Sequence, residues 1–125
     1  GYSKTINTTV DDAVDKVTKE LQKEGFGVLT EIDVKTALKK KLDVDFRPYR
    51  ILGACNPPFA YKALEAIEDI GLLMPCNVIV YENTEGETVV SAIEADVMLS
   101  VVDNEDLGQY AKQISEKLHK VIEAV

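Results

Sequence analysis

The two cysteines of the chain each precede an asparagine, and together they flank one predicted helix. Cys55-Asn56 follows an apolar run, and Cys76-Asn77 begins the next apolar run. If these runs form neighbouring antiparallel strands, both cysteines lie at the same end of one sheet. Two thiols there could bind a soft metal such as Cu(I) or form a reversible disulfide. Cys55, Asn56, Cys76 and Asn77 are therefore predicted to form one candidate ligand or redox site.

Each of these residues also has a purely structural interpretation. Cysteine is among the most frequently buried residue types, and asparagine at a strand end caps backbone groups. A helix N-terminus would lower the pKa of Cys55, but Pro57 and Pro58 remove two of the N–H donors that a terminus offers. His119, the single histidine, is remote in sequence, so a zinc site would need carboxylates or a second chain.

Familiar catalytic motifs are missing from the sequence. It contains no GxSxG, P-loop, GxGxxG or HExxH pattern. We therefore predict no catalytic residue, no metal site and no cofactor, and the sequence leans against an enzyme.

Charge and composition limit the partners that the chain can have. Its net charge of −8 repels nucleic acids and anionic membranes, and its longest uncharged run, residues 70–81, is too short to span a bilayer. We predict no nucleic-acid partner and no membrane partner. Two cysteines in 125 residues indicate reduced thiols and a cytoplasmic protein. A cluster of six cations is interpreted as a solvated helix face rather than an anion-binding patch: Lys35, Lys39, Lys40, Lys41, Arg47 and Arg50.

Apolar periodicity predicts a single α+β domain over residues 1–125. The expected strands are residues 2–6, 26–32, 49–54, 76–82 and 87–95, and the expected helices are residues 10–24, 34–42, 57–70 and 105–125. The type of the apolar segment 97–102 stays open. The hairpin around residues 83–86 favours α+β over a doubly wound sheet.

Sequence signals also predict where the helices begin and which way they face. The expected N-caps are Thr8 or Thr9, Asp33, Asn56, and Asp103 or Asn104. Helical spacing places Leu64 on the inner face of the helix over residues 57–70 and Leu118 in the core, and it leaves His119 facing solvent.

Residues 49–82, YRILGACNPPFAYKALEAIEDIGLLMPCNVIVYE, resemble domain-of-unknown-function family 302 (DUF302). Residues 25–46, GFGVLTEIDVKTALKKKLDVDF, resemble the entry strand and helix of the same family, and ACNP and LLMPCNV are the specific segments. The resemblance implies a largely antiparallel curved sheet with a long C-terminal helix packed on it, in the TATA-binding-protein-like grouping, with extra helices inserted. It also implies a homodimer, and it carries over no catalytic residue.

These patterns indicate a small-molecule or partner binding module, or an accessory module, without identifiable catalytic machinery. Its ligand is an unknown small molecule. The alternative is a thiol-dependent redox or soft-metal-binding protein that uses Cys55 and Cys76. A homodimer is also expected because the uncharged apolar segment 97–102 and the hairpin edge are surfaces that need cover.

Overall fold

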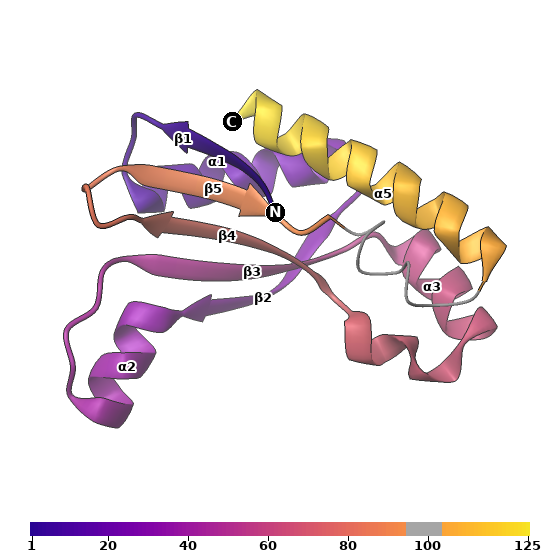
Figure 1. The fold of residues 1–125 in the computed structure, drawn as a ribbon, viewed down its shortest axis with the longest axis horizontal. Helices are drawn as coiled ribbons and strands as arrows, with labels where there is room; N and C mark the ends of the chain where they lie inside the picture. The colour runs from indigo at the N-terminus through magenta and orange to yellow at the C-terminus, as the bar shows by residue number, and fades with distance from the viewer. Residues whose placement is uncertain (95–103) are drawn as a thin grey trace.

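The described part of the chain folds around one curved, five-stranded sheet (Figure 1). The structure, a computed structural model, describes residues 1–94 and 104–125. The strands are β1 (Tyr2–Ile6), β2 (Gly27–Asp33), β3 (Tyr49–Cys55), β4 (Cys76–Glu82) and β5 (Thr88–Ala92). They lie in the order β1-β5-β4-β3-β2, and every neighbouring pair is antiparallel. This confirms the predicted α+β class, while the segment 97–102 lies outside the described residues.

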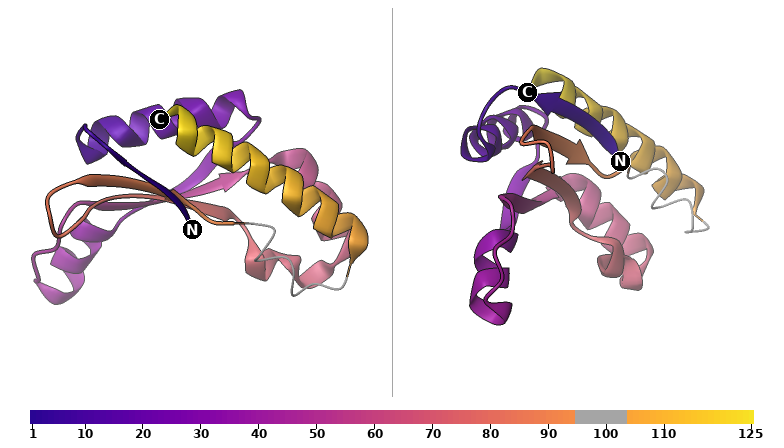
Figure 2. Two further views of the ribbon diagram at one scale, coloured as in Figure 1. Left: turned by 45° about the horizontal axis from the view of Figure 1, so that its top comes forward. Right: turned by 60° about the vertical axis from the view of Figure 1, so that its left-hand side comes forward.

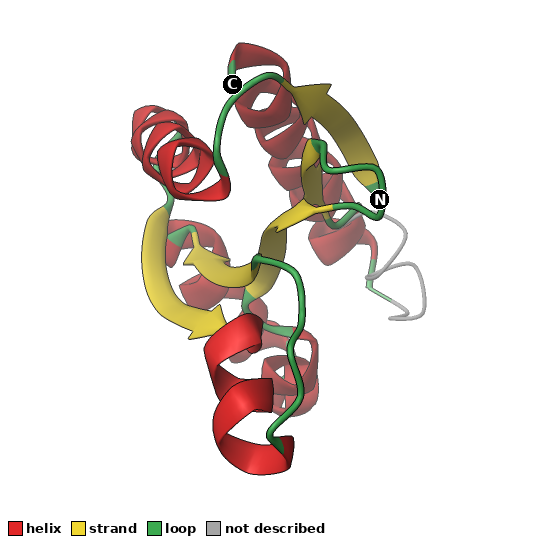
Figure 3. Ribbon diagram, turned by 90° about the vertical axis from the view of Figure 1, so that its left-hand side faces the viewer, coloured by secondary structure: helices red, strands yellow, loops and turns green. Residues whose placement is uncertain are grey.

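The helices divide into a pair on the sheet and others at its ends. They are α1 (Val10–Lys23), α2 (Val34–Leu42), α3 (Pro57–Ala66), the 3-10 helix η1 (Glu68–Leu73) and α5 (Glu105–Ala124). Helices α1 and α5 lie side by side on one face, called the inner face here (Figure 2). Helix α2 stands apart from them (Figure 3). Among the described residues no helix is long and apolar enough to cross a membrane.

Four helices begin at the residues that the sequence predicts. The side chains of Thr9, Asp33, Asn56 and Asn104 each accept a hydrogen bond from the backbone N–H three residues later. Such a bond satisfies a donor that the first helical turn leaves free, and it is worth about 1 kcal/mol. Local side-chain chemistry therefore sets where these helices start.

The core lies between the inner face and the two long helices. Val80 pairs with Val90 in the register of β4 and β5, and both are fully buried. Leu52 of β3 and Leu21 of α1 are buried in the same cluster. Leu118 of α5 has no exposed surface, which confirms its predicted place in the core. The apolar stripe of α5 thus closes the inner face, as its helical spacing predicts.

The opposite face of the sheet, called the outer face here, carries uncharged side chains along its paired strands. By register and strand alternation, Ile32, Ile51 and Ile79 form one row across β2, β3 and β4. Tyr49 and Tyr81 stand beside this row with their rings stacked, centroids 5.1 Å apart. Ile32 is 49% exposed, so the row lies partly open to solvent.

Helix α3 is shorter than the sequence predicts. It ends at Ala66 rather than near Gly71, because the backbone of Ile67 is extended (φ −142°, ψ 113°). The 3-10 helix η1 follows and buries Ile70. Leu64, predicted to face inward, is 46% exposed. Its neighbour Ala63 is fully buried and packs in the core instead.

The prediction that His119 faces solvent is wrong. Its ring stacks on that of Tyr2, with centroids 4.0 Å apart, and its Nε2 atom is buried without a hydrogen-bond partner among the described residues. The Tyr2 hydroxyl donates to the Glu123 carboxylate, and Lys4 Nζ donates to the carbonyl oxygens of Glu123 and Val125. Strand β1 therefore covers a side of α5 that the helical pattern alone leaves open.

Replacing Leu118 by alanine tests how α5 packs. We expect Leu118→Ala to lower the free energy of unfolding by about 2–5 kcal/mol, because truncating a buried leucine loses burial and leaves a cavity. Leu72→Ala is the matched control: Leu72 is 87% exposed, so it should change stability by less than about 0.5 kcal/mol. Urea denaturation followed by circular dichroism measures both. Equal effects of the two variants would contradict the packing of α5.

Candidate functional site

The two cysteines lie at the same end of the sheet. Strand β3 ends at Cys55 and β4 begins at Cys76, and Ala54 is the register partner of Cys76. Both cysteines are free thiols. Together with Asn56 they line a mainly apolar cavity of about 20 Å³, called the cysteine cavity here, which has room for about one water molecule.

The other predicted site residues separate into two groups. Asn56 lines the cysteine cavity while its Oδ1 atom caps α3, and Phe59 lines the cavity as well. Asn77 is exposed and is not part of the lining, since strand alternation turns it away from its neighbour Cys76. Tyr61 of α3 is also exposed and does not line the cavity. The structure brings Cys55, Asn56 and Cys76 together and places Asn77 elsewhere.

Burial makes both thiols harder to ionise. It raises the pKa of Cys55, and it raises the pKa of Cys76 to about 11, with a smaller contribution from the nearby Cys55. This is opposite in sign to the effect expected of a helix N-terminus, because desolvation disfavours the charged thiolate. The nucleophile and the soft-metal ligand are both the thiolate, so the geometry does not favour the redox or metal alternative. Among the described residues no group of three or more His, Cys, Asp or Glu side chains could hold a metal ion.

The cysteine cavity adjoins a groove between α3 and α5. The groove has an inner part of about 140 Å³ that shares Asn56, Phe59 and Ile114 with the cavity. The inner part is lined by Asn56, Pro58, Phe59, Lys62, Tyr110, Gln113, Ile114 and Lys117. It widens into an outer part of about 490 Å³ that Asp106 and Gln109 help to line. We call the two parts together the α3–α5 groove.

Lysine and tyrosine side chains meet across this groove. Lys62 Nζ of α3 donates to Tyr110 Oη of α5 at 2.6 Å and lies 4.7 Å from the centroid of the tyrosine ring. The Phe59 ring meets Tyr110 edge-on, with centroids 6.1 Å apart. Among the described side chains no carboxylate oxygen lies within 4.0 Å of the ammonium nitrogen of Lys62 or Lys117. Two cations therefore face the groove, and neither is paired with a carboxylate of the described side chains.

Sequence reasoning missed the polar residues of this groove. Tyr110, Lys62 and Lys117 are not among the candidate residues that the sequence singles out. The amphipathic pattern of α5 identifies its buried face, but it does not identify the helix that lies across from its edge. No signal in the sequence pairs residues 62 and 110.

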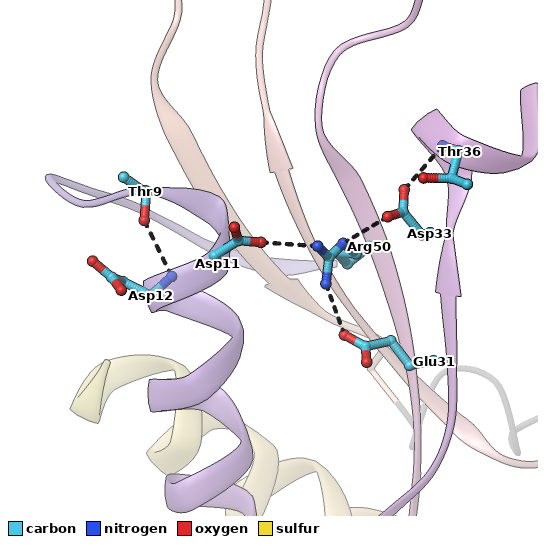
Figure 4. Close-up of polar contacts among 7 residues, drawn as sticks. All are labelled: Thr9, Asp11, Asp12, Glu31, Asp33, Thr36 and Arg50. Atoms are coloured by element: carbon cyan, nitrogen blue, oxygen red, sulfur yellow. Dashed lines mark hydrogen bonds and ion pairs between the residues drawn. The ribbon is translucent and has the colours of Figure 1, made fainter. Parts of the chain in front are cut away.

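Arg50 occupies the other end of β3 and is surrounded by carboxylates (Figure 4). It contacts Asp11 of α1 at 2.8 Å, Glu31 of β2 at 3.1 Å and Asp33 at 3.5 Å. The Thr36 N–H that Asp33 caps lowers the pKa of Asp33 most, and Arg50 lowers it further. Because three acidic groups balance one guanidinium, Arg50 joins three elements and is not a free anion site.

The lysines grouped with Arg50 in the sequence behave differently from it. Lys39, Lys40 and Lys41 are exposed on α2, as a solvated helix face predicts. Lys39 pairs with Asp43 at 3.0 Å and with Asp45 at 3.4 Å. The six predicted cations therefore form no single patch.

The architecture is an antiparallel α+β domain whose helix-lined groove leads to a thiol-lined cavity. The family model described as a domain of unknown function, DUF302, matches residues 2–125, and the chain belongs to the DUF302 family. The crystal structure of an uncharacterized conserved protein DUF302 from Bacillus stearothermophilus is similar, with a TM-score of 0.90 at 27% identity over 98% of this chain and 95% of that chain. No curated protein matches the chain. The resemblance seen in residues 25–46 and 49–82 is confirmed.

Thiol alkylation tests the environment of the cysteines. We expect iodoacetamide at pH 7.5 to modify Cys55 more slowly than a cysteine in an unfolded peptide, and Cys76 more slowly still, because burial raises both pKa values. Both rates should rise with pH, and the rate at Cys76 should still be rising near pH 10. Peptide mass spectrometry over time measures each site, with urea-unfolded protein as the control. Rapid modification of Cys76 at pH 7 would show an activated thiol instead.

Proposed function

We propose that this DUF302 protein is a binding or accessory module that holds a small ligand in the α3–α5 groove. One observation carries the proposal: Lys62 and Lys117 face the groove beside the aromatic rings of Phe59 and Tyr110, with no carboxylate paired to either lysine among the described side chains. An apolar wall with a few convergent polar groups is typical of a small-molecule site. The outer part, about 490 Å³, lies within the usual size range of such sites.

The chemistry of the groove supports binding rather than catalysis. The two thiols lie in the adjoining cysteine cavity, and their raised pKa values keep them protonated at neutral pH. His119 is not among the residues that line the groove and stacks on Tyr2 instead. Nucleophilic catalysis most often uses a cysteine, serine or threonine beside a histidine, and the described lining of the groove holds none of these residues.

A groove-filling variant tests where ligands bind. We expect at least one of benzoate, benzylamine and benzamide to raise the melting temperature of the wild type, because a ligand at 100 times its Kd stabilises the native state by about 2.7 kcal/mol. Gln113→Trp should abolish this rise, since exposed Gln113 lines both parts of the groove and the indole would fill it. Glu116→Trp, at an exposed position on α5 outside the lining, is the control. The proposal would be contradicted if none of the three compounds raised the melting temperature of the wild type. It would also be contradicted if the rise were equal in the wild type and in Gln113→Trp.

We further propose that the protein is a homodimer that associates through the outer face. The partly exposed row of Ile32, Ile51 and Ile79, beside the stacked Tyr49 and Tyr81, supports this. An apolar row of this kind at the surface of a chain is typical of an interface. In a twofold dimer each copy presents the same surface to the other, so the two rows would cover each other.

Charge supports a second copy as the occupant of this face. Each chain carries a net charge of −8, so two copies repel each other over most of their surfaces. The paired strand positions of the outer face carry no charge; they are Ser3, Thr5, Gly27, Thr30, Ile32, Tyr49, Ile51, Gly53, Cys55, Asn77, Ile79, Tyr81, Val89 and Ser91. Two copies would therefore meet there without burying an unpaired charge.

Light scattering tests the dimer. We expect twice the mass of one chain at micromolar concentration, and the mass of one chain for Ile79→Glu, because a carboxylate at the centre of the interface would be buried opposite its copy. Ile79 is partly exposed in the single chain, so the variant should still fold. Gln22→Glu adds the same charge at an exposed site on α1 and should leave the dimer intact. A monomer mass for the wild type would refute the proposal.

We also propose a cytoplasmic location. Two free cysteines, both kept protonated by burial, support a reducing compartment. A disulfide between Cys55 and Cys76 in protein isolated from its source would argue against it.

A further inference from the structure

The inner part of the α3–α5 groove combines an apolar wall with a group of hydrogen-bond donors. Phe59 and Ile114, both nearly buried, line one side. Lys62 and Lys117 approach from α3 and α5, and Tyr110 lies with them. One side therefore suits a hydrocarbon group and the other suits a group that accepts hydrogen bonds.

The donors in this group exceed the acceptors. Tyr110 Oη accepts a hydrogen bond from Lys62 Nζ, so the hydroxyl hydrogen of Tyr110 points away from that lysine and has no acceptor among the described residues. An ammonium group has three N–H donors, so Lys62 keeps two after this bond, and Lys117 adds its own. Such a set matches the two oxygens of a carboxylate, each of which accepts more than one hydrogen bond.

The beginning of α3 does not supply these donors. Its first two residues, Pro57 and Pro58, have no N–H, and the N–H of Phe59 is already bonded to the Asn56 side chain. The N–H of Ala60 is bonded to the Asn56 carbonyl oxygen. Recognition of an anion here therefore depends on the lysine and tyrosine side chains.

Charge and size place the two parts of a ligand. Asp106 helps to line the outer part of the groove but not the inner part, so an anionic group is favoured on the inner side, near Lys62 and Lys117. The inner part measures about 140 Å³. Cavities of about 150 Å³ in other proteins hold one benzene molecule, so this space fits a single six-membered ring.

We propose that the α3–α5 groove binds a small aromatic carboxylate. The ring packs against Phe59 and Ile114, and the carboxylate accepts hydrogen bonds from Lys62, Lys117 and Tyr110. The inference rests on the proposed binding function and specifies the ligand class of the same groove.

Three probes separate the contributions of the ring and of the charge: benzoate, the neutral isostere benzamide, and acetate, which lacks the ring. We expect a saturable titration of backbone amide resonances by benzoate, measured by two-dimensional NMR on the full chain. Benzamide and acetate should each bind at least about tenfold more weakly, since one loses the charge-assisted bonds and the other loses the apolar contact.

Two lysine variants test the carboxylate contact. Lys62→Met and Lys117→Met keep an apolar stem of similar length, so each should weaken benzoate binding by about tenfold or more. Each should weaken benzamide binding much less, because the neutral amide makes no charge-assisted bond to lysine. Lys112→Met, at an exposed position of the same helix α5, should change neither. The NMR spectrum of each variant also reports whether it is folded.

The outcomes distinguish failure of the ligand class from failure of the binding function. Equal affinity for benzoate and benzamide, or benzoate binding that both Met variants retain, overturns the carboxylate assignment and leaves the groove as a binding site. If benzylamine or benzamide binds and benzoate does not, the carboxylate assignment is likewise overturned and the groove remains a binding site. Absence of binding by benzoate, benzamide and benzylamine overturns the inference and the proposed function together.

Discussion

The apolar inner face of the sheet must be removed from water by helices that reach across its strands. Helix α5 meets this requirement because its 20 residues span about 30 Å, and its stripe around Leu118 is fully buried. Because α5 is this long, its first turns lie beside α3, where Tyr110 accepts a hydrogen bond from Lys62. The burial that stabilises the sheet thus also fixes one wall of the α3–α5 groove, so the groove is positioned by the core and not by a loop.

Much of this fold follows from short-range patterns. The caps at Thr9 and Asn56 and the spacing around Leu118 each depend on neighbours within one or two turns, which the sequence displays directly. The end of α3 was not predictable in this way, because Ile67 leaves the helix with no proline or glycine to signal it. The facing of His119 was missed because its cover, Tyr2, comes from the opposite end of the sequence.

For the candidate site, too, contacts between residues close in sequence could be predicted, whereas contacts between distant residues could not. Antiparallel neighbours bring Cys55 and Cys76 to one sheet end, and this could be inferred from two adjacent apolar runs. The raised pKa of Cys55 was not predicted, because a helix N-terminus is visible in the sequence whereas the depth of burial is not. The partnership of Lys62 with Tyr110 spans 48 residues and depends on how two helices lie side by side, which periodicity does not specify.

The bonds between β1 and α5 constrain the order in which the domain can form. Tyr2 and Lys4 bond to Glu123 across 121 and 119 residues, and in the sheet of the described residues β1 is an edge strand that pairs with β5. During synthesis β1 leaves the ribosome before β5, with which it pairs, and its contacts with α5 must wait until α5 has followed. Contacts so distant in sequence carry a large loop-closure cost and slow folding. Strand β1 is therefore made before its partners and secured only after them, and until then it is an exposed edge on which chaperones or other nascent chains can act.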